Sequence, residues 1–205
     1  MENFKGLLYY LFGRVYITKN IRLCNEDLLL HISDTPSSFY PGLRLLLKDL
    51  RPKYIIHTGD LVDNIKLQLY PNKIDIYKKK IKVLIKILEN SFADEIYLVL
   101  GNHDDYSAVK TFTKKSIILK EGKIITIDND IYNISHFSNS IIEAPAEYNL
   151  YGHDTALHSK IENKKVYLNG IEGINIIALS SKKIFVLPYP HGTNDDRMCK
   201  SNVGI

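Results

Sequence analysis

The stretch Ile96-Tyr-Leu-Val-Leu-Gly-Asn-His-Asp104 combines an apolar run with a glycine and three polar side chains. The apolar run predicts a buried strand that ends near Leu100. Glycine then permits a tight turn, and Asn102, His103 and Asp104 begin the following loop. Amide, imidazole and carboxylate groups are the donors that divalent metal ions bind in proteins. The stretch therefore predicts a metal site at the carboxyl end of a strand.

Three other segments have the same form. Asp34 follows Leu28-Leu-Leu-His-Ile-Ser, Gly59-Asp60 follows Tyr54-Ile-Ile-His-Thr, and Gly152-His153 follows Asn149-Leu-Tyr. In open α/β sheets, ligands bind beyond the carboxyl ends of the strands. The four segments together predict one site at one edge of a sheet.

Strand and helix patterns alternate through the first half of the chain. Apolar runs at 27–33, 54–57 and 96–100 predict buried strands, and periodic runs at 41–50 and 74–88 predict amphipathic helices. This β-α-β-α-β order favours a largely parallel sheet covered by helices.

The second half contains short apolar runs separated by turn residues such as Glu121-Gly122. Runs of this length between turns predict short strands. We expect them to form a second, more antiparallel sheet. The runs are 117–119, 123–127, 131–135, 165–168, 174–179 and 183–187.

The order Asp34, Gly-Asp60, Gly-Asn-His-Asp104, Ser-His136 and Gly-His153 resembles the calcineurin-like metallophosphoesterase family. The resemblance implies an α/β fold in which a two-sheet β-sandwich is flanked by helices. We expect a helical extension at 1–26, a metallophosphoesterase domain at 27–190 and a C-terminal tail at 191–205.

In this family two metal ions are bridged by the aspartate that matches Asp60. The resemblance implies that one ion is completed by Asn102, His136 and His153. It also implies that His103 lies near the leaving-group oxygen, where it protonates that oxygen or stabilises its charge while a carboxylate, Asp104, orients its ring.

The second metal position departs from the family pattern. Its ligands in the family are Asp34, the bridging aspartate and two histidines, but Pro36 and Thr155 stand at the two histidine positions. Three readings follow: replacement ligands complete the site, one ion binds alone, or the fold is retained for binding only, as in the retromer subunit that shares this architecture. The candidate replacements are Asp154, Thr155, His158 and His191.

The favoured function is hydrolysis of a phosphomonoester or phosphodiester, nucleotides included, with one or two ions of manganese, iron or zinc. The alternative is an inactive binding or scaffold module whose protein partner contacts the apolar segment 7–11. A net charge of +4 is too small to favour nucleic acid as the main partner.

The remaining features favour structural roles. Cys24 and Cys199 lie far apart, which is typical of a protein in a reducing cytoplasm. The apolar N-terminal segment predicts a docked amphipathic helix and is too short to span a bilayer. His31 and His57 lie within apolar runs and are expected to be hydrogen-bonded core residues. Lys79, Lys80, Lys82 and Lys86 are expected to form the solvated face of a helix.

Overall fold

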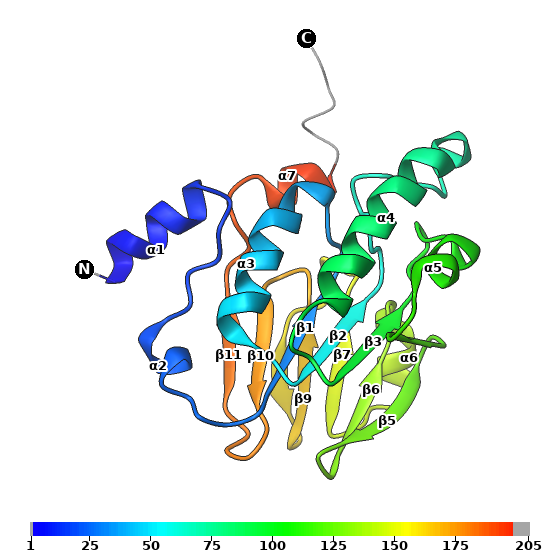
Figure 1. Cartoon of the computed structure of the whole chain (residues 1–205). Coiled ribbons are helices and arrows are strands. Elements are labelled where there is room, and N and C mark those ends of the chain that lie inside the picture. Colours follow the sequence, from blue (N-terminus) through cyan, green and yellow to red (C-terminus); the bar gives the residue numbers. More distant parts are fainter. Residues whose placement is uncertain (1, 199–205) are drawn as a thin grey trace.

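Two β-sheets lie face to face in the computed structural model, which describes residues 2–198 (Figure 1). Cys199 and the rest of the expected tail, 199–205, lie outside the described residues. The first sheet has the strand order β11-β10-β1-β2-β3-β4. Its strands are β1 (Leu28–Ile32), β2 (Tyr54–Thr58), β3 (Glu95–Val99), β4 (Ile117–Leu119), β10 (Ile174–Ala178) and β11 (Ile184–Leu187).

The first sheet is parallel from β1 to β4, with Leu30 opposite Ile55 in the β1–β2 pair. β10 and β11 extend it antiparallel on the other side of β1. The predicted parallel β-α-β-α-β unit is therefore confirmed. The expectation that 117–119, 174–179 and 183–187 belong to the second sheet is wrong, because β4 pairs with β3, β10 pairs with β1 and β11 pairs with β10. Short apolar runs carry no signal that identifies their pairing partner.

The second sheet has the order β5-β6-β7-β9-β8 and is mixed. The β5–β6 and β8–β9 pairs are antiparallel, whereas β7 pairs in parallel with both β6 and β9. Its strands are β5 (Lys123–Ile127), β6 (Asp130–Ile134), β7 (Tyr148–Tyr151), β8 (Lys160–Glu162) and β9 (Lys165–Asn169).

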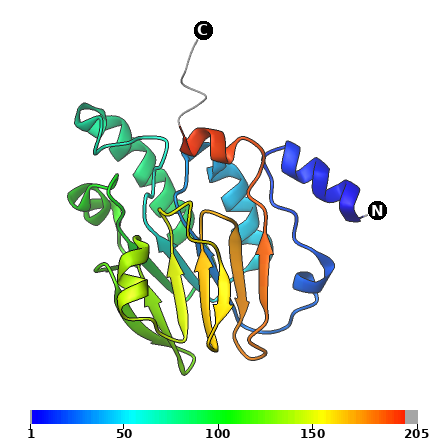
Figure 2. The same cartoon turned by 180° about the vertical axis from the view of Figure 1, so that it is seen from behind.

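Helices cover the outer faces of both sheets. α3 and α4 lie against the first sheet with α5 beside α4, and α6 lies on the second sheet (Figures 1 and 2). The architecture is the two-sheet sandwich flanked by helices that the sequence predicted. The helices are α1 (Glu2–Leu11), α2 (Lys19–Arg22), η1 (Ser37–Phe39), α3 (Tyr40–Leu50), η2 (Pro71–Lys73), α4 (Ile74–Glu89), α5 (Tyr106–Phe112), α6 (Ser138–Glu143) and α7 (Thr193–Arg197).

Strand alternation divides the core into two layers. In β1, Leu28, Leu30 and Ile32 face the helices, and Leu29 faces the second sheet. Both faces of the central strands are therefore apolar, which explains their continuous apolar sequences. Such burial holds the carboxyl ends of β1, β2 and β3 in fixed positions at one edge of the sandwich.

The two histidines within these strands are hydrogen-bonded core residues, as expected. His31 lies between Thr58 Oγ1 at 3.0 Å and Asn175 Nδ2 at 3.1 Å. His57 contacts Thr35 Oγ1 at 2.8 Å and accepts a bond from the Gly59 backbone N–H at 3.2 Å. Both rings are fully buried.

Acid is expected to destabilise the protein through these two rings. Burial lowers the pKa of His31 to about 3, below its ordinary value of 6.5, so the unfolded state takes up the proton first. Each such ring contributes stability above pH 6.5 that is lost as the pH falls towards 3, at up to about 1.4 kcal/mol per pH unit. Urea unfolding should show that the free energy of unfolding falls less between about pH 7 and pH 5 in His31→Gln than in the wild-type protein. An equal fall in both proteins would contradict the role of the buried His31 ring in acid destabilisation.

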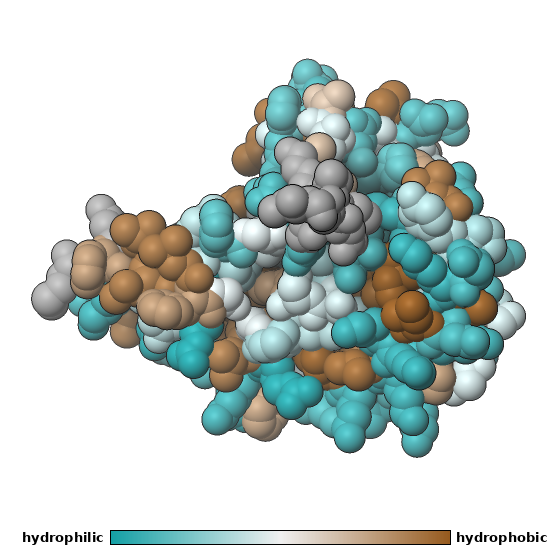
Figure 3. All heavy atoms as spheres, turned by 90° about the horizontal axis from the view of Figure 1, so that it is seen from above, coloured by the Kyte–Doolittle hydropathy of each residue, from teal (hydrophilic) through white to brown (hydrophobic). Residues whose placement is uncertain are grey.

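The N-terminal helix α1 contacts the domain through Tyr10, whose carbonyl accepts the His191 N–H at 3.0 Å and whose ring packs against His191, but its other apolar side chains differ from the prediction. Its apolar side chains were expected to dock on the domain, yet Phe4, Leu7, Leu8, Leu11 and the following Phe12 are all exposed. The helix projects from the body of the molecule and carries an apolar surface (Figures 1 and 3). None of the described helices is long and apolar enough to cross a membrane.

Candidate metal centre

Three site residues have a left-handed backbone conformation, and each lies two positions after the last residue of a strand. Asp34, Asp60 and His153 have φ angles of 49°, 52° and 56°. This conformation is uncommon for residues other than glycine and is typical of sharp, functional turns. The turns are bonded to one another, because the Asp34 N–H donates to the Gly59 carbonyl at 2.9 Å and the Thr35 N–H donates to Asp60 O at 2.9 Å.

The predicted ligands of the first metal position converge at this edge. The ligand atoms of Asp60, His136 and His153 lie within 4.8 Å of one another. Asn102 Oδ1 lies 3.1 Å and Asp60 Oδ2 lies 3.6 Å from His136 Nε2. The structure thus brings together the four side chains that the sequence assigned to this position.

The hydrogen bonds of His136 show that this donor set fits a cation. His136 Nδ1 lies 2.7 Å from the Thr58 carbonyl, which only accepts, so Nδ1 carries the proton in the neutral ring. Nε2 then presents a lone pair towards Asn102 Oδ1 and Asp60 Oδ2, which are also acceptors. Three acceptors that face one another without a proton between them are the arrangement that a divalent ion satisfies.

Further residues orient these ligands. The Asn102 amide donates to Gln68 Oε1 at 2.6 Å, which turns its Oδ1 towards His136. Glu121 accepts the backbone N–H groups of His136 at 2.9 Å and Phe137 at 2.8 Å. The sequence analysis missed Gln68 and Glu121, because neither belongs to a motif.

Two positions of the motifs require glycine, because a side chain from another segment approaches the backbone closely at each. A Cβ atom at Gly101 would lie 2.2 Å from Asp60 Oδ1, and one at Gly59 would lie 2.4 Å from His136 Nδ1. Gly59 also has a φ of 101°, where glycine is favoured. Each glycine therefore admits the ligand of another segment.

The predicted ligand Asp60 belongs to a buried group of carboxylates. Asp34, Asp60 and Asp63 are each at most 4% exposed. Burial and the neighbouring Asp104, Asp34 and Asp63 raise the pKa of Asp60 well above its ordinary range. Burial and Asp34 raise the pKa of Asp63 to about 6. The edge therefore favours positive charge.

His103 and Asp104 occupy different environments. The His103 backbone N–H donates to Asp60 Oδ1 at 2.9 Å, and its ring Nδ1 is buried without a hydrogen-bond partner. Burial, followed by the charge of Lys66, lowers the pKa of His103 to about 4. Asp104 accepts from the N–H groups of Leu61 and Gly101, both at 2.9 Å, and from Tyr77 Oη at 2.8 Å. Its carboxylate therefore fixes the loops and does not orient His103 as expected.

Of the candidate replacement ligands, only Thr155 lines the cavity at this edge. Asp154 accepts from the backbone of Ala156 and Leu157 and from Ser138 Oγ. His158 is exposed and pairs with Glu172. The ring of His191 packs against Tyr10. The structure therefore does not bring Asp154, His158 or His191 to the second metal position.

Two cations line the cavity at this edge, and the sequence analysis assigned a role to neither. Lys66 and Arg197 line the same cavity of about 320 Å³ as Asp34, Asp60 and His103. Lys66 pairs with Asp63, and Arg197 is 6% exposed. Arg197 belongs to α7, so the expected tail forms part of the site as far as it is described.

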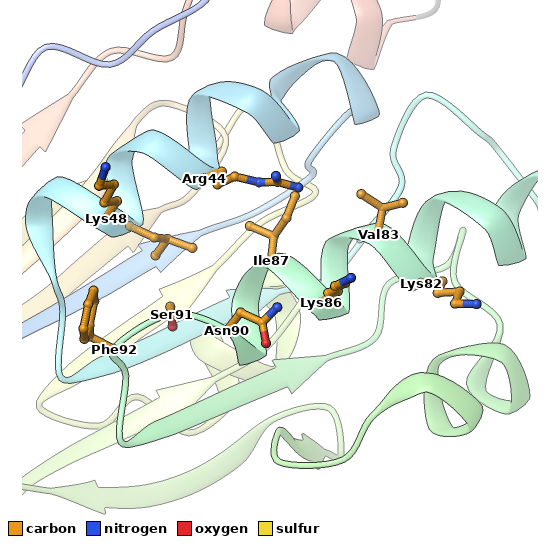
Figure 4. Close-up of a pocket in the computed structure, with 10 residues that line it drawn as sticks. Arg44, Lys48, Lys82, Val83, Lys86, Ile87, Asn90, Ser91 and Phe92 are labelled. Carbon is orange, nitrogen blue, oxygen red and sulfur yellow. The ribbon is translucent and has the colours of Figure 1, made fainter.

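A larger groove of about 590 Å³ lies elsewhere, between α3 and α4 (Figure 4). Arg44 and Lys48 line it from α3, and Lys82 and Lys86 line it from α4. The four lysines predicted on the solvated face of α4 are exposed. None of the metal ligands lines this groove, so the smaller cavity is the candidate functional site.

The comparisons with known proteins agree with this geometry. The sequence profile of the calcineurin-like phosphoesterases matches residues 28–195. The chain belongs to the calcineurin-like phosphoesterase family. No curated protein matches it.

Solved structures share the fold. An archaeal phosphodiesterase is 19% identical with a TM-score of 0.54, and the match covers 77% of this chain and 97% of that one. The phosphoesterase Yfce from E. coli is 15% identical with a TM-score of 0.53, covering 79% and 98%. Zinc-bound Vps29 from Entamoeba histolytica is 16% identical with a TM-score of 0.45, covering 77% and 88%. At these identities the likeness to the first two structures concerns the fold alone.

Proposed function

We propose that the protein is a metal-dependent phosphoester hydrolase whose divalent ion is held by Asp60, Asn102, His136 and His153. The observation that carries this proposal is the convergence of acceptor atoms around His136 Nε2. Manganese, iron and zinc all suit this mixed oxygen and nitrogen set. A phosphomonoester or phosphodiester, including a nucleotide, is the expected substrate class, with nucleic acid ranked lower. A cytoplasmic location stays a prediction from the cysteine pattern.

The ion supplies Lewis acidity and lowers the pKa of a coordinated water when it is bound. The chain's own residues position the phosphoryl group. His103 lies beside Asp60 with a neutral ring at neutral pH, because its pKa is lowered to about 4. A neutral imidazole has one N–H that can donate to a phosphoryl or leaving-group oxygen. Phe137 packs edge-on against the rings of His136 and His153.

Removal of one imidazole ligand tests the assignment. We expect His153→Ala to weaken Mn²⁺ binding by at least about 100-fold, since even residues behind metal ligands change affinity by 10–100-fold. Hydrolysis of p-nitrophenyl phosphate and its diester should fall with it. Titration of chelator-stripped protein with Mn²⁺ measures the first effect.

His158→Ala is the matched control, because His158 is exposed and pairs with Glu172. It should bind Mn²⁺ like the wild-type protein. Unchanged Mn²⁺ affinity in His153→Ala would exclude the proposed ligand set.

The alternative function, an inactive binding module, is favoured by one observation. α1 and Phe12 expose large apolar side chains, among them Phe4 at 66% and Phe12 at 75%. Such a surface is typical of a docking site for a protein partner. This alternative predicts that the wild-type protein binds no Mn²⁺ in the same titration and hydrolyses neither ester.

A further inference from the structure

We propose that the ammonium group of Lys66 occupies the place of the second metal ion and binds the phosphoryl group beside a single divalent ion. The inference rests on the proposed function and deepens it, because it assigns the phosphate-binding partner of that site.

The second metal position lacks the two imidazole ligands that stand there in the family. Pro36 has no donor atom, and Thr155 offers only a neutral hydroxyl. The Asp34 carboxylate is already engaged, since Oδ2 accepts from Ser33 Oγ at 2.5 Å and from the His153 N–H at 3.2 Å. The imidazole ligands of this position are therefore missing, and its remaining carboxylate is held by protein donors.

The position nevertheless requires positive charge. Asp34, Asp60 and Asp63 lie buried around one cavity. The ligand atoms of Asp60, Asp63 and His103 lie within 4.8 Å of one another, so this group could hold a cation. Buried carboxylates without a compensating cation are strongly unfavourable.

Lys66 supplies that cation. Its ammonium group donates to Asp63 Oδ1, and the Lys66 side chain is 18% exposed. Its charge helps to lower the pKa of both His103 and His153, after the larger effect of burial. Lys66 lines the same cavity as both of these histidines. It lies three residues after Asp63, and its backbone carbonyl accepts the turn bonds from Leu69 and Tyr70.

An ammonium ion can replace part of what a second metal ion does. It has three N–H donors, of which Asp63 accepts one. The others remain for a phosphoryl oxygen, and lysine binds phosphate as a point charge. Unlike a metal ion, it needs no imidazole ligands. This explains why both family histidines are absent from the same position and none from the other.

Metal stoichiometry in Lys66→Ala tests the inference. We expect the variant to bind one Mn²⁺ ion more than the wild-type protein, because Asp60, Asp63 and His103 then face an open cation position. Calorimetric titration and elemental analysis of stripped, reloaded protein measure the difference. The additional ion should disappear in the double variant Lys66→Ala/Asp63→Asn.

Three further variants complete the experiment. Lys66→Met keeps the aliphatic stem and removes only the charge, so it replaces Lys66→Ala if that variant does not fold. Lys66→Arg keeps the charge, and Lys79→Ala removes an exposed lysine of α4. Both should bind the wild-type number of ions.

The difference in bound Mn²⁺ between Lys66→Ala and the wild-type protein tests the role of Lys66. The number of Mn²⁺ ions that the wild-type protein binds tests the proposed hydrolase. An equal number of ions in Lys66→Ala and wild type overturns the inference, as does an additional ion that persists without Asp63. A wild-type protein without Mn²⁺ contradicts the proposed function and the single ion beside Lys66. A gain of one ion in Lys66→Ala would still show that the Lys66 ammonium group fills a cation position.

Discussion

Asp60→Asn is expected to abolish measurable Mn²⁺ binding and to lower phosphoester hydrolysis by about 10³-fold or more, since a Lewis-acid ion supplies several kcal/mol of stabilisation. Asp60 Oδ2 lies 3.6 Å from His136 Nε2 and is the central carboxylate of the group. Asparagine keeps an oxygen for the His103 N–H but removes the negative charge. Metal titration and a steady-state assay measure the two losses.

The same variant should fold at least as well as the wild-type protein in the absence of metal. Burial and the neighbouring carboxylates raise the pKa of Asp60, which means that its charge is unfavourable in the folded state. Asparagine is neutral and removes this unfavourable charge from the folded state. Functional residues often lower the stability of the fold in this way. A thermal unfolding midpoint that is equal or higher therefore separates loss of function from loss of fold.

Asp105→Asn is the matched control. Asp105 caps α5 by accepting the Ala108 N–H at 2.7 Å, and asparagine caps helices equally well. This variant should retain Mn²⁺ binding and hydrolysis. If Asp60→Asn also retains both, Asp60 is not a metal ligand and the proposed hydrolase is wrong.

The side chains that we propose as metal ligands could be named from sequence and family resemblance, and they lie together at one edge of the sandwich. A buried strand, a glycine and a polar residue mark Asp60 and Asn102, and the family resemblance adds His136. The core histidines were also predictable, because strand alternation fixes their direction. The carboxyl ends of parallel strands then meet at one edge, whatever the rest of the chain does.

The residues that complete the site could not be predicted in this way. Lys66 and Gln68 lie in a turn without regular periodicity, and Arg197 lies in a polar segment near the end of the chain. Their positions depend on how loops distant in sequence pack together. The prediction that β4, β10 and β11 belong to the second sheet was wrong for the same reason, since the pairing of strands depends on long-range contacts. The amphipathic pattern of α1 likewise indicates a helix without indicating what covers it.

Arg197 shows how such long-range contacts hold the site. Its Nε donates to the Asp34 carbonyl at 2.6 Å, its Nη2 to the Ser33 carbonyl at 2.9 Å, and its Nη1 to the Ile171 carbonyl at 3.0 Å. The guanidinium group also stacks over the Tyr189 ring at 4.0 Å. One side chain of α7 therefore joins the turn after β1 to the segment before β10. Planar, multiple donation of this kind is specific to arginine.

Arg197→Met is expected to destabilise the protein by about 3 kcal/mol, because several buried carbonyl groups lose their donor at once. In a chain of this size such a loss lowers the thermal unfolding midpoint by roughly 6–12 °C. Mn²⁺ should still bind to the folded variant, since Asp60, Asn102, His136 and His153 do not contact Arg197 through any described hydrogen bond. Arg44→Met, which replaces an exposed arginine of α3, should leave the midpoint unchanged. An unchanged midpoint in Arg197→Met would mean that α7 does not stabilise the turn at Asp34. Arg197 would then not hold its side of the cavity that Lys66 also lines.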